Sequence, residues 1–197
     1  MKMPPLSANK IMIIIGCLLV FLMVLNAGLS TKKHQELWKK CHDGDIDICT
    51  ALINSKQVPD KERARYFAAR AYHYDQKGDY DKAIADYGNA ISRIEGQPAA
   101  QAALYASRAS SHAKKGRYDD AIADYNSAIN LVPPNTAPGL YCGRAEAEYH
   151  KGDAAHGDAD LAQARKIAPQ AACIAKTQQP GNPAPQAPIP MTPHPAP

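Results

Sequence analysis

The segment from Tyr105 to Val132 reads YASRASSHAKKGRYDDAIADYNSAINLV and has two close copies in the same chain. One copy, residues 67–94, reads FAARAYHYDQKGDYDKAIADYGNAISRI, and the other, residues 141–168, reads YCGRAEAEYHKGDAAHGDADLAQARKIA. The glycine in the middle of each copy recurs after 38 and then 36 residues (Gly78, Gly116 and Gly152). A fixed period of this length is typical of stacked helical hairpins, so we expect an all-α solenoid.

Small and aromatic residues recur at matching places in the three copies. The first helix of each copy begins with an aromatic residue and carries an alanine four positions later (Phe67 and Ala71, Tyr105 and Ala109, Tyr141 and Ala145). The second helix carries an alanine and then an aromatic residue in two copies, whereas the third copy has Gly157 and Leu161 (Ala83 and Tyr87, Ala121 and Tyr125). This order resembles the tetratricopeptide repeat (TPR). The resemblance implies three repeats, at residues 61–97, 98–134 and 135–169.

An arginine and an aspartate also recur, 16 residues apart, in every copy. The arginine falls on the first helix and the aspartate on the second (Arg70 and Asp86, Arg108 and Asp124, Arg144 and Asp160). One interpretation is a charged ligand site. We favour the other, a structural ion pair between the two helices of each repeat, because all three repeats share it.

Similarity to the TPR family also implies where a partner would bind. In that family the first helices line a concave face that holds a peptide or a partner helix. The implied binding residues here are Tyr72, Asp75, Gln76, Ser110, Lys114, Glu146, Tyr149 and His150. The variant of the family that holds a C-terminal carboxylate needs Lys, Asn and Arg at several of these places. This chain has Ala68, Tyr72 and Gly143 instead, so we do not expect that ligand.

Residues 31–60 are expected to form a degenerate helical hairpin in front of the repeats. Trp38 supplies an apolar residue to its first helix, and Asp43-Gly44-Asp45 supplies the turn. The tryptophan, the cysteines on either side of this turn and the segment CTALI resemble small exported alphaproteobacterial TPR proteins. If the chain is exported, its four cysteines outside the apolar run allow two disulfides. Spacing favours Cys41 with Cys49 and Cys142 with Cys173, although three connectivities are possible and four free thiols are the alternative.

The N-terminal residues 1–30 contain an apolar run, IMIIIGCLLVFLMVL, from Ile11 to Leu25. Lysines precede it, and the run extends to Leu29 with only Asn26 as an interruption. A membrane anchor needs about 17–25 apolar residues and a signal peptide about 7–15. We favour an uncleaved anchor in the inner membrane over a cleaved signal. Either alternative predicts that the repeats lie in the bacterial cell envelope, facing the periplasm, or are secreted.

The C-terminal end changes composition abruptly. Residues 170–177, QAACIAKT, are expected to start a capping helix, since terminal repeats are atypical. Residues 178–197 read QQPGNPAPQAPIPMTPHPAP, a proline-rich stretch that cannot build a core. We expect a disordered tail that serves as a spacer, with recognition of its PxxP spacing by a partner as the alternative.

Charge and motifs exclude several function classes. The formal net charge is only +4, with no basic block, so we expect no nucleic-acid partner. No nucleophile–base, phosphate-loop or haem motif is present, and the acidic turn lacks the later residues of a calcium loop. We therefore expect no enzyme, no cofactor and no metal, but a scaffold that binds a protein partner. The alternatives are a self-assembling structural protein and an accessory subunit of an envelope enzyme.

Overall fold

A computed structural model describes residues 32–133 and 135–170 of the chain. These residues are all helical apart from short loops, and no strand occurs within them. A helix over residues 32–42 comes first. It is followed by α2 (Ile46–Asn54), α3 (Asp60–Gln76), α4 (Tyr80–Ile91), α5 (Pro98–Lys114), α6 (Tyr118–Leu131), α7 (Pro138–Lys151) and α8 (Ala154–Ile167). The all-α prediction is confirmed for this part of the chain.

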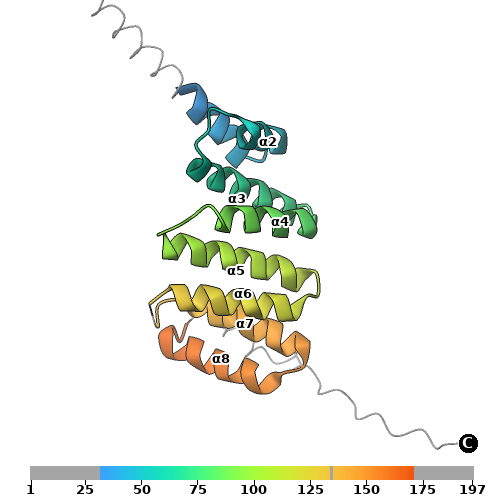
Figure 1. The fold of residues 1–197 in the computed structure, drawn as a ribbon. Helices are drawn as coiled ribbons and strands as arrows, with labels where there is room; N and C mark the ends of the chain where they lie inside the picture. The colour runs from blue at the N-terminus through green and yellow to red at the C-terminus, as the bar shows by residue number, and fades with distance from the viewer. Residues whose placement is uncertain (1–31, 134, 171–197) are drawn as a thin grey trace, which may run out of the picture.

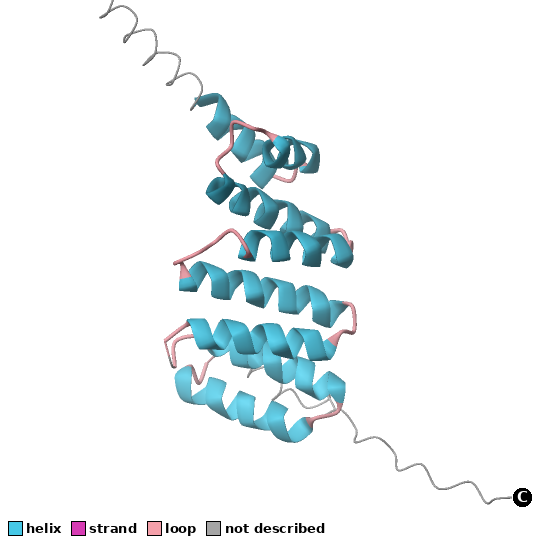
Figure 2. Ribbon diagram, viewed as in Figure 1, coloured by secondary structure: helices cyan, strands magenta, loops and turns pink. Residues whose placement is uncertain are grey.

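The helices form antiparallel pairs that succeed one another in chain order down the molecule (Figures 1 and 2). We call α3, α5 and α7 the first helices of the three pairs, and α4, α6 and α8 the second helices. Neighbouring first helices contact each other, whereas in the described residues no second helix contacts the next second helix. The first helices therefore lie closer together, and the second helices spread apart on the opposite face.

Three regions with predictions lie outside the described residues: the proposed anchor, the capping helix beyond residue 170 and the proline-rich tail. Within residues 32–133 and 135–170, none of the helices has both the length and the apolar character that crossing a bilayer requires.

Glycine and proline set where the helices begin and end. Gly78, Gly116 and Gly152 follow the first helices with φ values of 80°, 77° and 92°, a left-handed conformation that glycine adopts without steric cost. Pro98 and Pro138 start α5 and α7, where a missing backbone N–H costs nothing. The recurring glycines therefore lie at the turns between the first and second helices.

Alanine packing holds the two helices of each pair close together. Ala71 and Ala83 are fully buried in the first pair, as are Ala109 and Ala121 in the second. The third pair differs because Tyr149 stands where the second has Ala113. A Cβ atom at Gly157 would lie 2.9 Å from the Tyr149 ring, too close for any larger residue. This contact explains why glycine replaces the alanine in the third copy.

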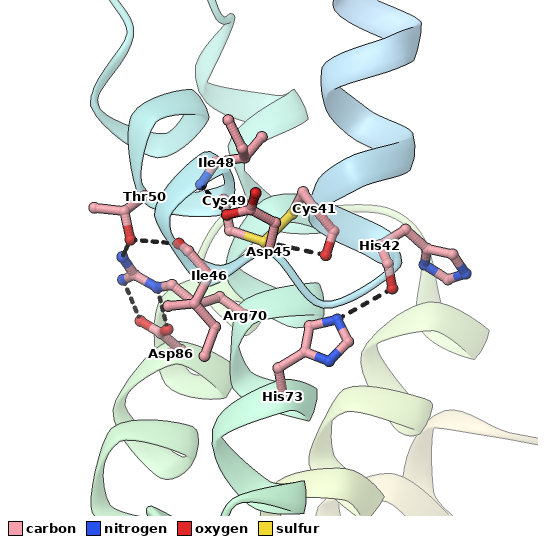
Figure 3. The surroundings of a disulfide bond; sticks show 10 residues. All are labelled: Cys41, His42, Asp45, Ile46, Ile48, Cys49, Thr50, Arg70, His73 and Asp86. Atoms are coloured by element: carbon pink, nitrogen blue, oxygen red, sulfur yellow. Dashed lines mark hydrogen bonds and ion pairs between the residues drawn. A yellow bond between two sulfur atoms is a disulfide. The ribbon is translucent and has the colours of Figure 1, made fainter.

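The N-terminal hairpin packs onto the first pair through a disulfide and an aromatic cluster. Cys41 and Cys49 are fully buried and form a disulfide across the turn, with their Cα atoms 4.8 Å apart (Figure 3). Trp38 packs against the buried Tyr66 of α3, with ring centroids 5.6 Å apart. The hairpin therefore covers the exposed end of the first pair.

Candidate functional site

Each recurring arginine forms a two-bond ion pair with the aspartate of its own pair of helices. Arg70 donates from Nε and Nη2 to Asp86 at 2.7 and 2.9 Å, and Arg108 donates to Asp124 at 2.7 and 2.7 Å. Arg144 and Asp160 repeat this arrangement at 2.6 and 2.6 Å. The aspartates are buried, and their hydrogen bonds raise the pKa of each guanidinium.

This geometry leaves the aspartates little room to bind a ligand. Both carboxylate oxygens of each aspartate already accept a hydrogen bond from its arginine. A buried carboxylate needs such partners to offset its desolvation. This geometry favours the structural interpretation of the pairs, in which they join the two helices of each repeat.

The residues implied to bind a partner separate into exposed and enclosed groups. Five are exposed on the face of the first helices: Tyr72, Gln76, Lys114, Glu146 and His150. Tyr72 stands out because 54% of its surface is exposed, which makes it the most exposed large apolar side chain in the described residues. Ser110 and Tyr149 are half-buried.

Asp75, which the family resemblance implies to be a binding residue, is enclosed by side chains of the next repeat. Only 9% of its surface is exposed. Ser111 donates from Oγ to Asp75 Oδ1 at 2.7 Å, and Lys114 donates to Oδ2. Because both donors lie on α5, this carboxylate connects the first pair of helices to the second. Its role is to hold neighbouring repeats together.

Tyr149 and His150 are also engaged by neighbouring side chains. Tyr149 donates from its hydroxyl to Asp158 of α8 at 2.7 Å, and burial raises its pKa to about 12. The His150 ring stacks on Tyr118, with centroids 5.1 Å apart and an interplanar angle of 8°. Tyr118 lies on the preceding pair, so this stack too crosses between repeats.

Ion pairs also join successive repeats. The recurring small and aromatic residues did not predict them. Lys151 donates to Asp119 at 2.6 Å, and Lys115 donates to Asp81. Asp81 and Asp119 occupy one repeat position, and Lys115 and Lys151 occupy another. Comparing charges at the repeat spacing would have found them, since each is an acid on a second helix facing a base on the next first helix.

Three of the four cysteines predicted to form disulfides lie within the described residues. Cys41 and Cys49 are joined, as described above. Cys142 is disulfide-bonded and nearly buried on α7, while Cys173 lies outside the described residues. No group of three or more potential metal ligands occurs within residues 32–133 and 135–170.

The comparison with known families agrees with this geometry. The family described as Tetratricopeptide repeat matches residues 64–96 and 102–135, which contain most of α3 and α5 and the whole of α4 and α6. The third pair, α7 and α8, lies beyond the matched residues. A comparison with curated proteins gave no match. Residues 64–96 and 102–135 are therefore similar to tetratricopeptide repeats, and they lie within a helical stack that carries the same Arg–Asp pair in α7 and α8.

Proposed function

We propose that this chain is a non-enzymatic scaffold that binds an extended peptide or a partner helix along the face of its first helices. The observation that carries the proposal is the exposed Tyr72 on α3. Tyrosine combines a large apolar surface with a hydroxyl, and such residues are enriched where proteins bind one another. TPR arrays typically bind protein partners, which supports the same conclusion.

Polar groups on α5 and α7 extend the proposed surface beyond Tyr72. Ser110 and Glu146 occupy the repeat position of Tyr72 on the next two first helices. The surface therefore presents one aromatic residue followed by a hydroxyl and a carboxylate. This arrangement suits a segment that lies across the helices, with an apolar residue at Tyr72 and a donor or a base near Glu146.

Site-specific crosslinking in cells tests the proposal. A photoreactive phenylalanine analogue at position 72 is expected to capture a partner on illumination. The matched control carries the analogue at Ala85, an exposed residue of α4 on the face of the second helices. Adducts that form at position 72 and not at position 85 would support the proposal. Identical adducts from both positions, or none from position 72, would contradict it.

We propose further that the scaffold is exported to the bacterial cell envelope and tethered there by residues 11–29. The apolar run supports this proposal. The Cys41–Cys49 disulfide also supports it, because structural disulfides persist in oxidising compartments. A reporter that is active only after export, fused after residue 177, is expected to be active. An inactive fusion alongside an active cytoplasmic reporter would refute export.

A further inference from the structure

A cleft on the face of the second helices is lined by a buried carboxylate, one oxygen of which has no hydrogen-bond partner among the described residues. The described residues form two separate clefts, one of about 660 Å³ beside the N-terminal hairpin and one of about 500 Å³ between α6, α7 and α8. The second of these is lined in part by Glu148 of α7. Only 8% of the Glu148 surface is exposed, and its buried Oε2 atom has no hydrogen-bond partner within residues 32–133 and 135–170. We consider only this cleft between α6, α7 and α8 below.

The cations that line the cleft are already paired with other acids. Arg144 donates two hydrogen bonds to Asp160 and lies 3.9 Å from Glu148 Oε1. Lys151 is paired with Asp119 at 2.6 Å. Glu148 thus has one distant cation on one oxygen and none on the other. A buried carboxylate in this situation costs stability, which is typical of a group kept for binding.

The charge of the cleft favours a cationic ligand. Three carboxylates line it, those of Glu148, Asp153 and Asp160, against the two cations Arg144 and Lys151. His156 also lines the cleft, and its ring lies 2.7 Å from Asp153 Oδ2. Ile122 and Ala159 add apolar surface to the wall. A lysine or arginine side chain fits these features of the cleft. Its apolar stem packs against the wall, while its charged end hydrogen-bonds to an acceptor.

At the corresponding positions of the preceding repeat, positive charges outnumber negative ones. There His112 replaces Glu148, and Arg117 replaces Asp153. Three cations (Arg108, Lys115 and Arg117) then stand against two carboxylates (Asp120 and Asp124). The preceding repeat has the same arrangement of helices but a different charge at these positions. It therefore provides an internal control for the cleft between α6, α7 and α8.

We propose that the cleft between α6, α7 and α8 binds a lysine or arginine side chain of a partner protein, with Glu148 as its acceptor. The site lies on the face of the second helices, so it is separate from the proposed surface on the first helices. It would orient a partner already held there or recruit a second one. The inference does not depend on what binds at Tyr72.

Titration of the ¹⁵N-labelled full chain with acetyl-Gly-Arg-Gly-amide tests the site. We expect the peptide to shift amide signals in Ile122–Asn126 and around Glu148 and Asp153, and acetyl-Gly-Lys-Gly-amide to do the same. The peptide with citrulline in place of arginine has nearly the same shape without the charge, and should leave these signals unmoved. Methylguanidinium tests for a free small cation, and should bind at least about tenfold more weakly because it lacks the stem.

Two matched variants complete the experiment. Glu148→Gln keeps the shape of the side chain and is expected to weaken binding of the arginine peptide by about tenfold or more, since it removes a charge-assisted contact. His112→Gln alters the corresponding residue of the preceding repeat and should leave binding unchanged. Equal binding by Glu148→Gln, by the citrulline peptide or by methylguanidinium would overturn the assignment, as would a lack of shifts near Glu148.

Discussion

Arg70 of α3 donates a hydrogen bond from Nη1 to Oγ1 of Thr50 on α2, at 2.8 Å (Figure 3). Arg144 does the same two repeats later, donating from Nη1 to Asn126 on α6. Thr50, Gly88 and Asn126 lie 38 residues apart in turn, so they occupy one position of the repeat. Each arginine therefore joins its own second helix to the preceding one, except that Gly88 offers Arg108 no side-chain acceptor.

Replacing Gly88 with asparagine is expected to stabilise the protein. A Cβ atom at Gly88 would lie 3.4 Å from Nη1 of Arg108, close enough for an asparagine side chain to accept its hydrogen bond without a clash. The free energy of unfolding should rise by about 1 kcal/mol, because a typical hydrogen bond contributes about 0.5–1.5 kcal/mol. Chemical denaturation measures the change.

Gly88→Ala separates the hydrogen bond from the helix propensity of the new residue. Alanine is the better helix former by up to about 0.7 kcal/mol and supplies no acceptor. If the bond forms, the asparagine variant is at least as stable as the alanine variant. An asparagine variant that is less stable by the full propensity difference would show that no bond forms.

Removing the arginine of one pair is expected to cost much more than an ordinary surface change. Arg108→Ala leaves the buried Asp124 without its two-bond partner. Breaking a buried ion pair on one side typically costs about 3–5 kcal/mol. We expect a loss of about 3 kcal/mol, because a quarter of the Arg108 side chain is exposed (25%). Thermal and chemical denaturation measure it.

A double variant distinguishes the lost pair from lost packing. Arg108→Met combined with Asp124→Leu removes both charges and keeps apolar bulk. It should unfold at a higher temperature than Arg108→Ala, since no charge is left buried alone. An unchanged melting temperature in Arg108→Ala would instead favour the ligand interpretation of this pair.

Sequence alone predicts most of the fold because the repeat imposes local rules. The turn glycines, the buried alanines and the 16-residue Arg–Asp spacing each report contacts within one hairpin. Contacts within one hairpin join residues that are close in the chain, so the residues that make them recur at a fixed spacing in each repeat. The degenerate hairpin was also predictable, since Cys41 and Cys49 flank a short turn.

Contacts between repeats were harder to predict from the sequence. They enclose one of the residues that the sequence assigned to the binding surface. Asp75 matches a binding position by register, yet Ser111 and Lys114 of the next first helix enclose it. The pairing depends on how far one hairpin is rotated against the next. That rotation follows from side-chain packing along the whole interface and leaves no periodic signal at a single position.

Gly143 is expected to tolerate no side chain. A Cβ atom there would lie 2.5 Å from Cζ of Tyr125, which packs from α6 against α7. Only 8% of the Tyr125 surface is exposed, so the ring has little room to move away. The same burial raises the pKa of Tyr125 to about 12. Gly143→Ala should lower the free energy of unfolding by about 1–3 kcal/mol, the usual cost of overpacking.

Gly139→Ala on the same helix is the matched control. None of the described residues lies within 4 Å of a Cβ atom at Gly139, so alanine should be neutral or raise stability by up to about 1 kcal/mol. Adding Tyr125→Leu to Gly143→Ala should recover part of the loss, because Leu161 fills the same position in the next repeat. Equal stability of the two single variants would contradict the proposed clash.

Glu148 and His112 occupy one repeat position but respond to pH in opposite directions. Burial, and then the charge of Asp160, raise the pKa of Glu148. Burial lowers the pKa of His112 despite the nearby Asp124 and Asp120. In both cases the folded protein favours the neutral side chain. Glu148 therefore costs stability when it is ionised, above its folded pKa, and His112 costs stability when it must be protonated, at acid pH.

Glu148→Gln is therefore expected to stabilise the protein at pH 7, and the gain should disappear as the pH falls below the ordinary glutamate pKa of about 4.3. The raised pKa means that the stability Glu148 contributes is present at low pH and is lost as the pH rises through the folded value.

His112→Gln should have the opposite profile, with its relative gain growing as the pH falls below about 6.5. Denaturation midpoints of both variants and the unmodified chain from about pH 3 to pH 8 measure the two profiles. Parallel profiles for Glu148→Gln and the unmodified chain would mean that Glu148 ionises as freely in the folded state as in the unfolded one, which the buried, unpartnered Oε2 atom argues against.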